Sequence, residues 1–428
     1  MRKGGVQSKT RTGVIAALDI GTSKMCCLIA RAGGAAGLRV TGIGHQVSHG
    51  VRAGAIVSLD EAEAAVRATV EAAEQMAGEQ IKQVVVNLSA GHPRSRLHAY
   101  DVSVAGHQIT DADLGRILAP SELPLDDDGD DGDGTGEREL VHAIPVGYTI
   151  DGNRGVHDPR GLYGQRLGVH LHIVSAERSA VRNLATCINR CHLDIEAKVI
   201  SPYAAALAGL VEDETQLGVT LIDMGGGTTS IAVFFDGELV HTDLIPVGGA
   251  HVTNDIAMGL STPRSHAERL KTLYGSVLPS PSDDREVLKV PLMGEEADGE
   301  TSQVPRSMLV GIMRPRLEET FEMVRARLEE AGFDQAVGRH VVLTGGASQI
   351  PGLRELAGQT LDKQVRLARP QPVEGLAEAA SGPAFATCVG LLRYAVQQPA
   401  EAVQTAARPM EEPNGRFGRI GQWIRENF

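Results

Sequence analysis

The sequence predicts an α/β protein in which two related halves face each other across a cleft. The main observation is an internal repeat: residues 14–44 (VIAALDIGTSKMCCLIARAGGAAGLRVTGIG) and 218–248 (GVTLIDMGGGTTSIAVFFDGELVHTDLIPVG) share one order of elements. Each runs through a buried strand, an Asp/Gly turn, a second strand, a glycine turn and a third strand. The second observation is the length of 428 residues, which suffices for two or three domains. Ligands tend to bind at the junction of such halves.

The composition is that of a soluble globular protein. Hydrophobic residues make up 42% and charged residues 22%, and no apolar run approaches the roughly 20 residues of a membrane span. The net charge of −13 argues against nucleic acid as a partner, because phosphate backbones bind basic surfaces. Residues 1–12 are basic without an apolar signal core, which predicts a disordered cytoplasmic tail. The cysteines suit reduced thiols, and a metal site at Cys187 and Cys191 lacks a second pair with ligand spacing.

The first half is expected to start with residues 13–88. Its Asp/Gly turn is the segment Asp19-Ile-Gly-Thr-Ser-Lys24. A helix is expected from Ser58 to Met76, since Ser58 and Glu61 have the spacing of a capping box. A strand over residues 83–88 closes this part of the chain.

Residues 89–175 fit neither repeat and predict a small inserted α+β domain. Residues 142–152 and 169–176 are strand-like, with Gly- and Pro-rich sequence between them. The acidic run at 126–137 (DDDGDDGDGTGE) imitates a calcium loop. However, Asp131 stands where the tight turn of such a loop needs glycine. A solvated, disordered insertion is therefore the favoured interpretation.

Residues 176–213 are expected to complete the first half, and residues 214–396 to form the second. In the second half, two strands flank the connection Asp223–Thr229. A hairpin that only had to turn would use two residues, as Asp236-Gly237 does immediately afterwards. A helix is expected to begin near Thr253.

Three glycine-containing loops are best explained by one shared function. They are Asp19–Lys24, Asp223–Ser230 and Leu343–Ser348, the last of which follows another apolar strand. Glycine allows a ligand to approach the backbone, free N–H groups bind phosphate, and an aspartate at a strand end can hold Mg²⁺. The chain has neither a P-loop nor a dinucleotide-binding glycine motif. The three loops together predict a nucleotide clamped between the halves.

These loops match the first phosphate, second phosphate and adenosine motifs of the actin-like ATPase superfamily, which the chain resembles. The segments VISPYAAALAGL (199–210) and HAERLKTLYG (266–275) narrow the resemblance to the FtsA family, as do the HAIPVGYTIDG…GLYG pattern of the inserted domain and the C-terminal tail. The resemblance extends from about Val14 to Phe428. It implies an actin-like ATPase fold, with two related α/β halves around a nucleotide cleft, an inserted small α+β domain and a C-terminal amphipathic helix.

The resemblance also implies roles for individual residues. ATP and Mg²⁺ are the implied cofactors, with Mg²⁺ held by Asp223 through water and by Asp19. The residues that the resemblance places around the nucleotide are Asp19, Gly21, Thr22, Ser23, Lys24, Asp223, Gly225, Gly226, Gly227, Thr228, Glu268, Lys271, Gly345, Gly346 and Ala347. Without it, Glu268 and Lys271 would be an ordinary surface pair at helical i,i+3 spacing.

One departure from the superfamily pattern bears on hydrolysis. In many actin-like ATPases an acidic or amide residue in the segment matching Ser201-Pro202-Tyr203 orients the attacking water. This sequence places Ser201 there. Because water positioning is a main protein contribution to phosphoryl transfer, hydrolysis is expected to be slow or undetectable. ATP then serves mainly as the ligand that closes the cleft and makes the chain polymerise.

The C-terminal tail predicts a membrane anchor. Residues 397–414 are rich in Ala, Pro, Gln and Glu, as flexible linkers are, and residues 415–428 form an amphipathic helical pattern. Such a helix lies in a lipid interface with its arginines towards anionic headgroups. The alternative is docking on the protein's own body or on a partner. The apolar arc and its flanking arginines are Phe417, Ile420, Trp423, Ile424 and Phe428, with Arg416, Arg419 and Arg425.

By resemblance, the chain is an actin-like filament protein that attaches FtsZ polymers to the inner face of the cytoplasmic membrane at the division septum. Its implied partners are FtsZ, other copies of itself, anionic lipids and, through the inserted domain, later division proteins. The FtsZ-binding surface is implied near residues 260–320. A small-molecule kinase of the same superfamily is one alternative, although no catalytic aspartate stands out in the first half. A non-polymerising scaffold is another.

Overall fold

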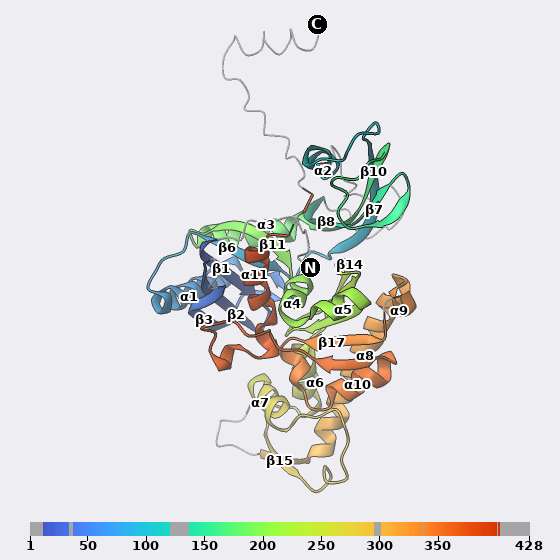
Figure 1. Ribbon diagram of the computed structural model, residues 1–428. Coiled ribbons are helices and arrows are strands. Elements are labelled where there is room, and N and C mark those ends of the chain that lie inside the picture. The colour runs from blue at the N-terminus through green and yellow to red at the C-terminus, as the bar shows by residue number, and fades with distance from the viewer. Residues whose placement is uncertain are drawn as a thin grey trace.

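The computed structural model describes residues 12–33, 37–119, 137–294, 301–336, 338–399 and 401–402. Two five-stranded sheets form the two halves of the body, and a four-stranded sheet forms the inserted domain at one end (Figure 1). The prediction of two α/β halves with an inserted α+β domain is confirmed. None of the helices in these ranges is long and apolar enough to span a bilayer.

The first sheet contains the first repeat. Its strands are β1 (Gly13–Ile20), β2 (Lys24–Ala32), β3 (Leu38–Val47), β6 (Gln83–Leu88) and β11 (Asp194–Ile200). They lie in the order β11-β6-β1-β2-β3, with β1 antiparallel to β2 and parallel to β6. The carboxyl ends of β1 and β6 therefore meet at one edge of the sheet.

The helix α1 (Leu59–Ala77) packs on this sheet and follows Ser58 as expected, but the expected capping box does not form. The Ser58 side chain makes no capping hydrogen bond. Its N–H group donates instead to the carbonyl oxygen of Gly50, at 3.1 Å. A backbone carbonyl group of a neighbouring turn thus accepts the hydrogen bond that the Glu61 side chain would have accepted in a capping box.

The second sheet repeats the arrangement of the first. Its strands are β12 (Val219–Met224), β13 (Thr229–Phe235), β14 (Glu238–Ile245), β17 (His340–Thr344) and β18 (Gln364–Leu367). The order β14-β13-β12-β17-β18 corresponds strand for strand to β3-β2-β1-β6-β11. The internal repeat found in the sequence is thus a repeat of structure.

Two details of the second half differ from expectation. The strands extend further into the glycine loop, because Asp223 pairs with Ser230 in the β12–β13 ladder, and the turn itself is Gly225–Thr228. Helix α6 (Gly249–Gly259) begins at Gly249 rather than near Thr253. Its first N–H groups donate to carbonyl oxygens of the glycine loop, so the helix begins directly beside that loop.

The last helix that the structure describes returns to the first half, a feature that was not predicted from the sequence. Residues 214–396 were expected to form the second half, but helix α11 (Ala386–Gln397) packs against α4 (Ser201–Gly209) and against the first sheet. A Cβ atom on Gly390 would lie 1.6 Å from the carbonyl oxygen of Ala204, so only glycine allows this close approach. The sequence pattern of α11 shows that it is apolar, but not which sheet it covers.

In its described residues, the inserted domain contains a sheet in the order β7-β10-β8-β9 and the helix α2. It contacts the edge strand β14 of the second half, where the Thr242 N–H donates to Ser95 Oγ at 3.1 Å. The strand β7 was not predicted. The elements of the domain are β7 (Arg94–Ser103), α2 (Asp111–Ile117), β8 (Arg138–Ile150), β9 (Asn153–Val156) and β10 (Arg166–Glu177).

The remaining elements connect or cover the sheets, and α7 and β15 lie at the end of the molecule opposite the inserted domain (Figure 1). The remaining helices are α3 (Arg178–Arg190), α5 (Glu212–Leu217), α7 (Arg264–Tyr274), α8 (Arg306–Glu330), α9 (Phe333–Ala336) and α10 (Leu353–Leu361), with the short helices η2 (Gly346–Gln349), η3 (Glu378–Ala380) and η4 (Pro383–Phe385). The remaining strands are β4 (Val51–Arg52), β5 (Ala55–Ile56), β15 (Val287–Pro291) and β16 (Thr301–Pro305).

Several expectations fall outside the described residues. They concern the N-terminal tail at 1–11, the acidic run at 126–136 and the amphipathic segment at 415–428. Of the expected flexible linker at 397–414, residues 397–399 and 401–402 are described. Gln397 ends helix α11, and Glu401 and Ala402 pack on the inserted domain instead of extending freely.

Candidate functional site

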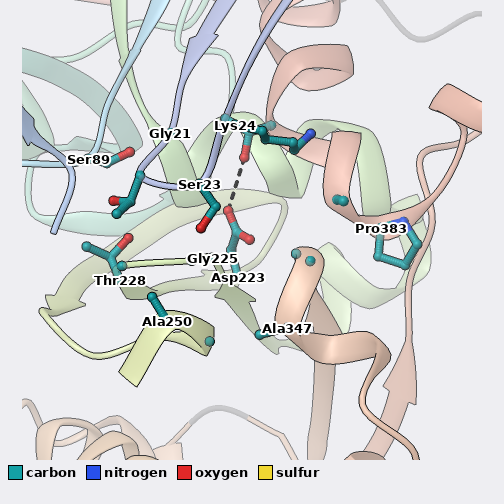
Figure 2. Close-up of a pocket in the computed structure, with 18 of the residues that line it drawn as sticks. Gly21, Ser23, Lys24, Ser89, Asp223, Gly225, Thr228, Ala250, Ala347 and Pro383 are labelled. Carbon is teal, nitrogen blue, oxygen red and sulfur yellow. Dashed lines mark hydrogen bonds between the residues drawn. The ribbon is translucent and has the colours of Figure 1, made fainter. Parts of the chain in front are cut away.

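A cavity of about 420 Å³ lies between the two halves (Figure 2). The residues that the resemblance placed around a nucleotide all line it, from Asp19 in the first Asp/Gly turn to Ala347 in the third loop. Three loops far apart in the sequence therefore converge on one space. The fold brings them together because β1 and β12, which carry the two aspartates, occupy equivalent positions in the two sheets.

Two buried carboxylates belong to this cavity, one from each half. Asp19 is 7% exposed and Asp223 is 8% exposed. Burial raises the pKa of Asp223 to about 6; a hydrogen bond from Thr387 opposes this rise, and the negative charge of Asp19 adds to it. Burial also raises the pKa of Asp19, against the opposing effect of the Lys24 ammonium. Two neighbouring buried carboxylates repel each other, so a cation between them would stabilise both charges.

The glycines of the second loop lie directly against the first loop. A Cβ atom on Gly226 would lie 2.0 Å from Ser23 Oγ, and one on Gly227 would lie 2.4 Å from Thr22 Oγ1. In the described part of the chain, the N–H groups of these four residues donate to no protein acceptor. Free N–H groups in a side-chain-free turn form a concavity that suits phosphate oxygens.

The third loop also requires glycine. Gly345 has a φ of +87°, and a Cβ atom there would lie 2.3 Å from Asp223 Oδ1. Gly346 and Ala347 follow in the short helix η2. A side chain at position 345 would collide with the aspartate of the second loop, so the absence of a side chain keeps that carboxylate in place.

Lys24 is the basic residue of the first turn, and its ammonium is unusual. Its Nζ is buried without a hydrogen-bond partner among the described residues. It lies 3.6 Å from the centroid of the Phe385 ring, a cation–π contact. A buried ammonium that lacks an acceptor is a favourable place for an anionic ligand.

Glu268 and Lys271 do form the i,i+3 ion pair that their spacing allows, with Lys271 Nζ 2.7 Å from Glu268 Oε2. Lys271 Nζ also donates to the carbonyl oxygen of Gly249 and to Thr253 Oγ1, at 3.0 and 2.8 Å. The pair therefore joins α7 to the first turn of α6 and lines the cavity at the same time.

Ser201, which the resemblance placed at the water-orienting position, also lines the cavity, together with three polar residues that were not predicted: Asn87, Ser89 and Thr387. Ser201 Oγ lies 2.5 Å from Ser89 Oγ and accepts from Asn87 Nδ2 at 3.1 Å. Thr387 donates to Asp223 Oδ2. Asn87 and Ser89 come at the end of β6, parallel to β1 and next to it, so strand order could have predicted them. No sequence signal indicated Thr387.

The residues of the cavity fit Mg·ATP. Among the described residues, the glycine loops offer N–H donors without a protein acceptor, and Lys24 offers an ammonium without a hydrogen-bond acceptor. Within the described ranges, no three His, Cys, Asp or Glu side chains form a metal-binding group. Mg²⁺ would therefore rest on the carboxylates of Asp19 and Asp223 together with phosphate oxygens, the usual mode for this ion at nucleotide sites. An ion held there would neutralise phosphate charge.

Two family models match the chain. The model for the cell division protein FtsA matches residues 220–390, and the model for the SHS2 domain inserted in FtsA matches residues 90–175. The chain is 43% identical to the cell division protein FtsA of Agrobacterium fabrum, over 98% of this chain and 96% of that protein. It is 34% identical to FtsA of Pseudomonas aeruginosa and 30% identical to FtsA of Escherichia coli, in both cases over 97% of this chain and 98% of the relative.

Solved structures of low sequence identity share the fold. A type IV pilus biogenesis complex of PilM and PilN superposes with a TM-score of 0.61 at 18% identity, over 90% of this chain and 99% of that one. The actin-like MreB5 of Spiroplasma citri, solved bound to ADP, superposes with a TM-score of 0.52 at 12% identity, over 90% and 97%. The fold is therefore actin-like, and the identities of 30–43% over nearly the whole length show that the chain belongs to the FtsA family of cell division proteins.

Proposed function

We propose that the protein binds Mg·ATP between its two halves and assembles into actin-like filaments at the division site. The observation that carries the proposal is the convergence of three glycine-containing loops and two buried carboxylates on one cavity of about 420 Å³. ATP contacts both halves there, so its binding favours one relative arrangement of the halves over others. The polymerising role is supported by the actin-like fold.

The proposed role of ATP is structural more than catalytic. Ser201 lines the cavity, and its hydroxyl is engaged by Ser89 and Asn87. A hydroxyl held in this way is a poor proton acceptor compared with a carboxylate. Attacking water is therefore weakly activated, and ATP persists in the cleft.

The filament is proposed to attach FtsZ to the inner face of the cytoplasmic membrane. The amphipathic segment at 415–428 supplies the attachment to anionic lipids. The proposed FtsZ-binding surface lies around α7 and the elements next to it, where several large apolar side chains are exposed. They are Met258, Leu273, Tyr274, Met293 and Met308. Exposed apolar groups of this kind favour a protein partner.

The inserted domain is proposed to bind later division proteins. It projects from the end of the molecule opposite α7 (Figure 1), so it is accessible when α7 is engaged. The protein would then work at the septum as a peripheral protein on the cytoplasmic side, without nucleic acid as a partner.

Electron microscopy of the full chain on an anionic lipid monolayer with Mg·ATP tests this proposal. Filaments that form with ATP and lipid, and not without ATP, are the expected result. ATP binding without filaments would favour a non-polymerising scaffold. ATP-dependent phosphorylation of a small molecule would favour a kinase and contradict the proposal.

A further inference from the structure

The end of the described chain leaves the two halves and packs on the inserted domain. Helix α11 ends at Gln397, and Gln398 turns the backbone with a φ of +42°. Shortly afterwards the N–H of Ala402 donates a 2.7 Å hydrogen bond to the carbonyl oxygen of Ala143 on β8. Ala402 is 5% exposed and belongs to the apolar core of the inserted domain. The described part of the chain therefore ends beside the inserted domain, not at the end of α11.

The carboxylate of Glu401 is held by two side chains from different parts of the fold. Its two oxygens lie 3.0 and 3.1 Å from Nδ1 of His142, and the hydroxyl of Tyr394 donates to Oε1 at 2.7 Å. Burial raises the pKa of Glu401, but His142, Tyr394 and the backbone of Ala143 together hold it below its ordinary value. The carboxylate is thus ionised, and hydrogen bonds to a charged acceptor are the stronger kind.

His142 is itself fixed to the first half. Its side chain is fully buried, and Nε2 accepts a 3.1 Å hydrogen bond from the N–H of Ile200. Since Nε2 is the acceptor, Nδ1 carries the proton that is donated to Glu401. The rings of Tyr203 and Tyr394 pack edge-on against the imidazole, with centroids 5.5 and 6.0 Å away. Ile200 ends β11 and directly precedes Ser201 of the cavity.

We propose that Glu401 and His142 form a latch that ties the inserted domain, the first half and the exit of the C-terminal segment into one unit. His142 lies on β8 and is bonded both to Ile200 and to Glu401. A rotation of the inserted domain at this seam breaks one of these bonds. Loss of the Glu401 carboxylate releases β8 and residues 401–402 together. One consequence, that membrane attachment and the orientation of the inserted domain depend on each other, rests on the function proposed above; the latch itself does not.

Hydrogen exchange of the full chain, followed by mass spectrometry without nucleotide, tests the latch. Glu401→Ala should speed exchange on the order of tenfold both at the Ala402 amide and in peptides from residues 138–150. Peptides from residues 219–235 should not change. The matched control is Glu374→Ala, because the side chain of Glu374 is 62% exposed and pairs with Arg39 only at 3.7 Å. The control should exchange like the parent chain.

A milder variant protects the test against misfolding. Tyr394→Phe removes one hydroxyl donor from Glu401 and should produce a smaller change in the same two regions. Faster exchange at Ala402 alone, with residues 138–150 unchanged, would overturn the latch, because the exit and β8 would then move independently. No change in either region would overturn it as well. Equal acceleration in residues 219–235 would reveal general destabilisation and would also contradict the proposal.

Discussion

The hydroxyl of Thr387 donates a 3.0 Å hydrogen bond to Oδ2 of Asp223, although 164 positions separate the two residues. Thr387 lies in α11, which packs on the first sheet, whereas Asp223 lies in β12 of the second sheet. The bond therefore joins the two halves at the cavity. It also shows how the returning helix α11 supports a carboxylate that is proposed to hold Mg²⁺.

The first prediction concerns stability without nucleotide. Burial raises the pKa of Asp223 to about 6, so the folded state binds the proton more tightly than the unfolded state does. Ionisation of Asp223 therefore opposes folding, and this contribution lowers stability as the pH rises from about 4 to above 6. Asp223→Asn keeps an acceptor for Thr387 and removes the charge. Its stability advantage should grow from well under 1 kcal/mol at pH 4 to ~3 kcal/mol at pH 7.5.

Urea unfolding of both chains across this pH range measures the effect. The control is Asp362→Asn, since the side chain of Asp362 is 96% exposed and pairs only weakly with Arg339, at 3.8 Å. A stability advantage of Asp223→Asn that is the same at every pH would mean that the carboxylate is not the source of the difference.

The second prediction concerns the membrane. Trp423→Glu places a charge in the apolar arc of the C-terminal segment and should release the protein from anionic liposomes. Deletion of residues 415–428 should do the same. Gln422→Glu is the matched control, because on a helical wheel position 422 lies opposite the arc and receives the same charge. ATP affinity should be unchanged in all three variants.

Co-sedimentation with liposomes tests this prediction. The fraction of protein that pellets with lipid should depend on filament assembly. One short interfacial helix binds weakly, but many helices on one filament act together, so filaments should pellet firmly with lipid and monomers weakly. If Trp423→Glu and the deletion pelleted as the parent chain does, the segment would not be the anchor. Docking on a protein partner would then be the better account.

The third prediction concerns turnover. With the Ser201 hydroxyl bonded to Ser89 and Asn87 and no carboxylate or amide at that position, phosphate release should fall far below a typical enzyme rate of ~10 s⁻¹. A phosphate-release assay with purified protein and Mg·ATP measures it. Rapid turnover that disappears when another cavity residue is changed would show that the catalytic position has been assigned wrongly.

Local sequence patterns predicted the parts of the molecule that depend on neighbouring residues. The repeat of strand, Asp/Gly turn and strand was visible because hydrophobic periodicity and glycine are local signals, and it led directly to Asp19 and Asp223. The two-residue turn at Asp236-Gly237 was also predicted, and both residues have positive φ. The resemblance to a family then supplied Glu268 and Lys271, which spacing alone would have left as a surface pair.

Contacts between distant parts of the chain could not be predicted in this way. The apolar pattern of α11 does not say which sheet it covers, so its return to the first half, and with it the role of Thr387, was missed. Glu401 and Ala402 have the composition of a linker, yet His142 and Ala143 of the inserted domain hold them. In both cases the deciding partner lies more than a hundred positions away.

Titration with labelled ATP tests the central claim, that the two halves clamp Mg·ATP between their glycine loops. The parent chain should bind one ATP per chain in a Mg²⁺-dependent manner. Asp223→Ala removes a carboxylate for the metal, and Gly226→Val adds a side chain where a Cβ atom would lie 2.0 Å from Ser23 Oγ; each should weaken binding by at least about tenfold. Gly311→Val is the control, because a Cβ atom there meets no atom within 4 Å. Weakened binding in the first two variants and unchanged binding in the control is the predicted result, and unchanged affinity in all three would contradict the assignment of the cavity.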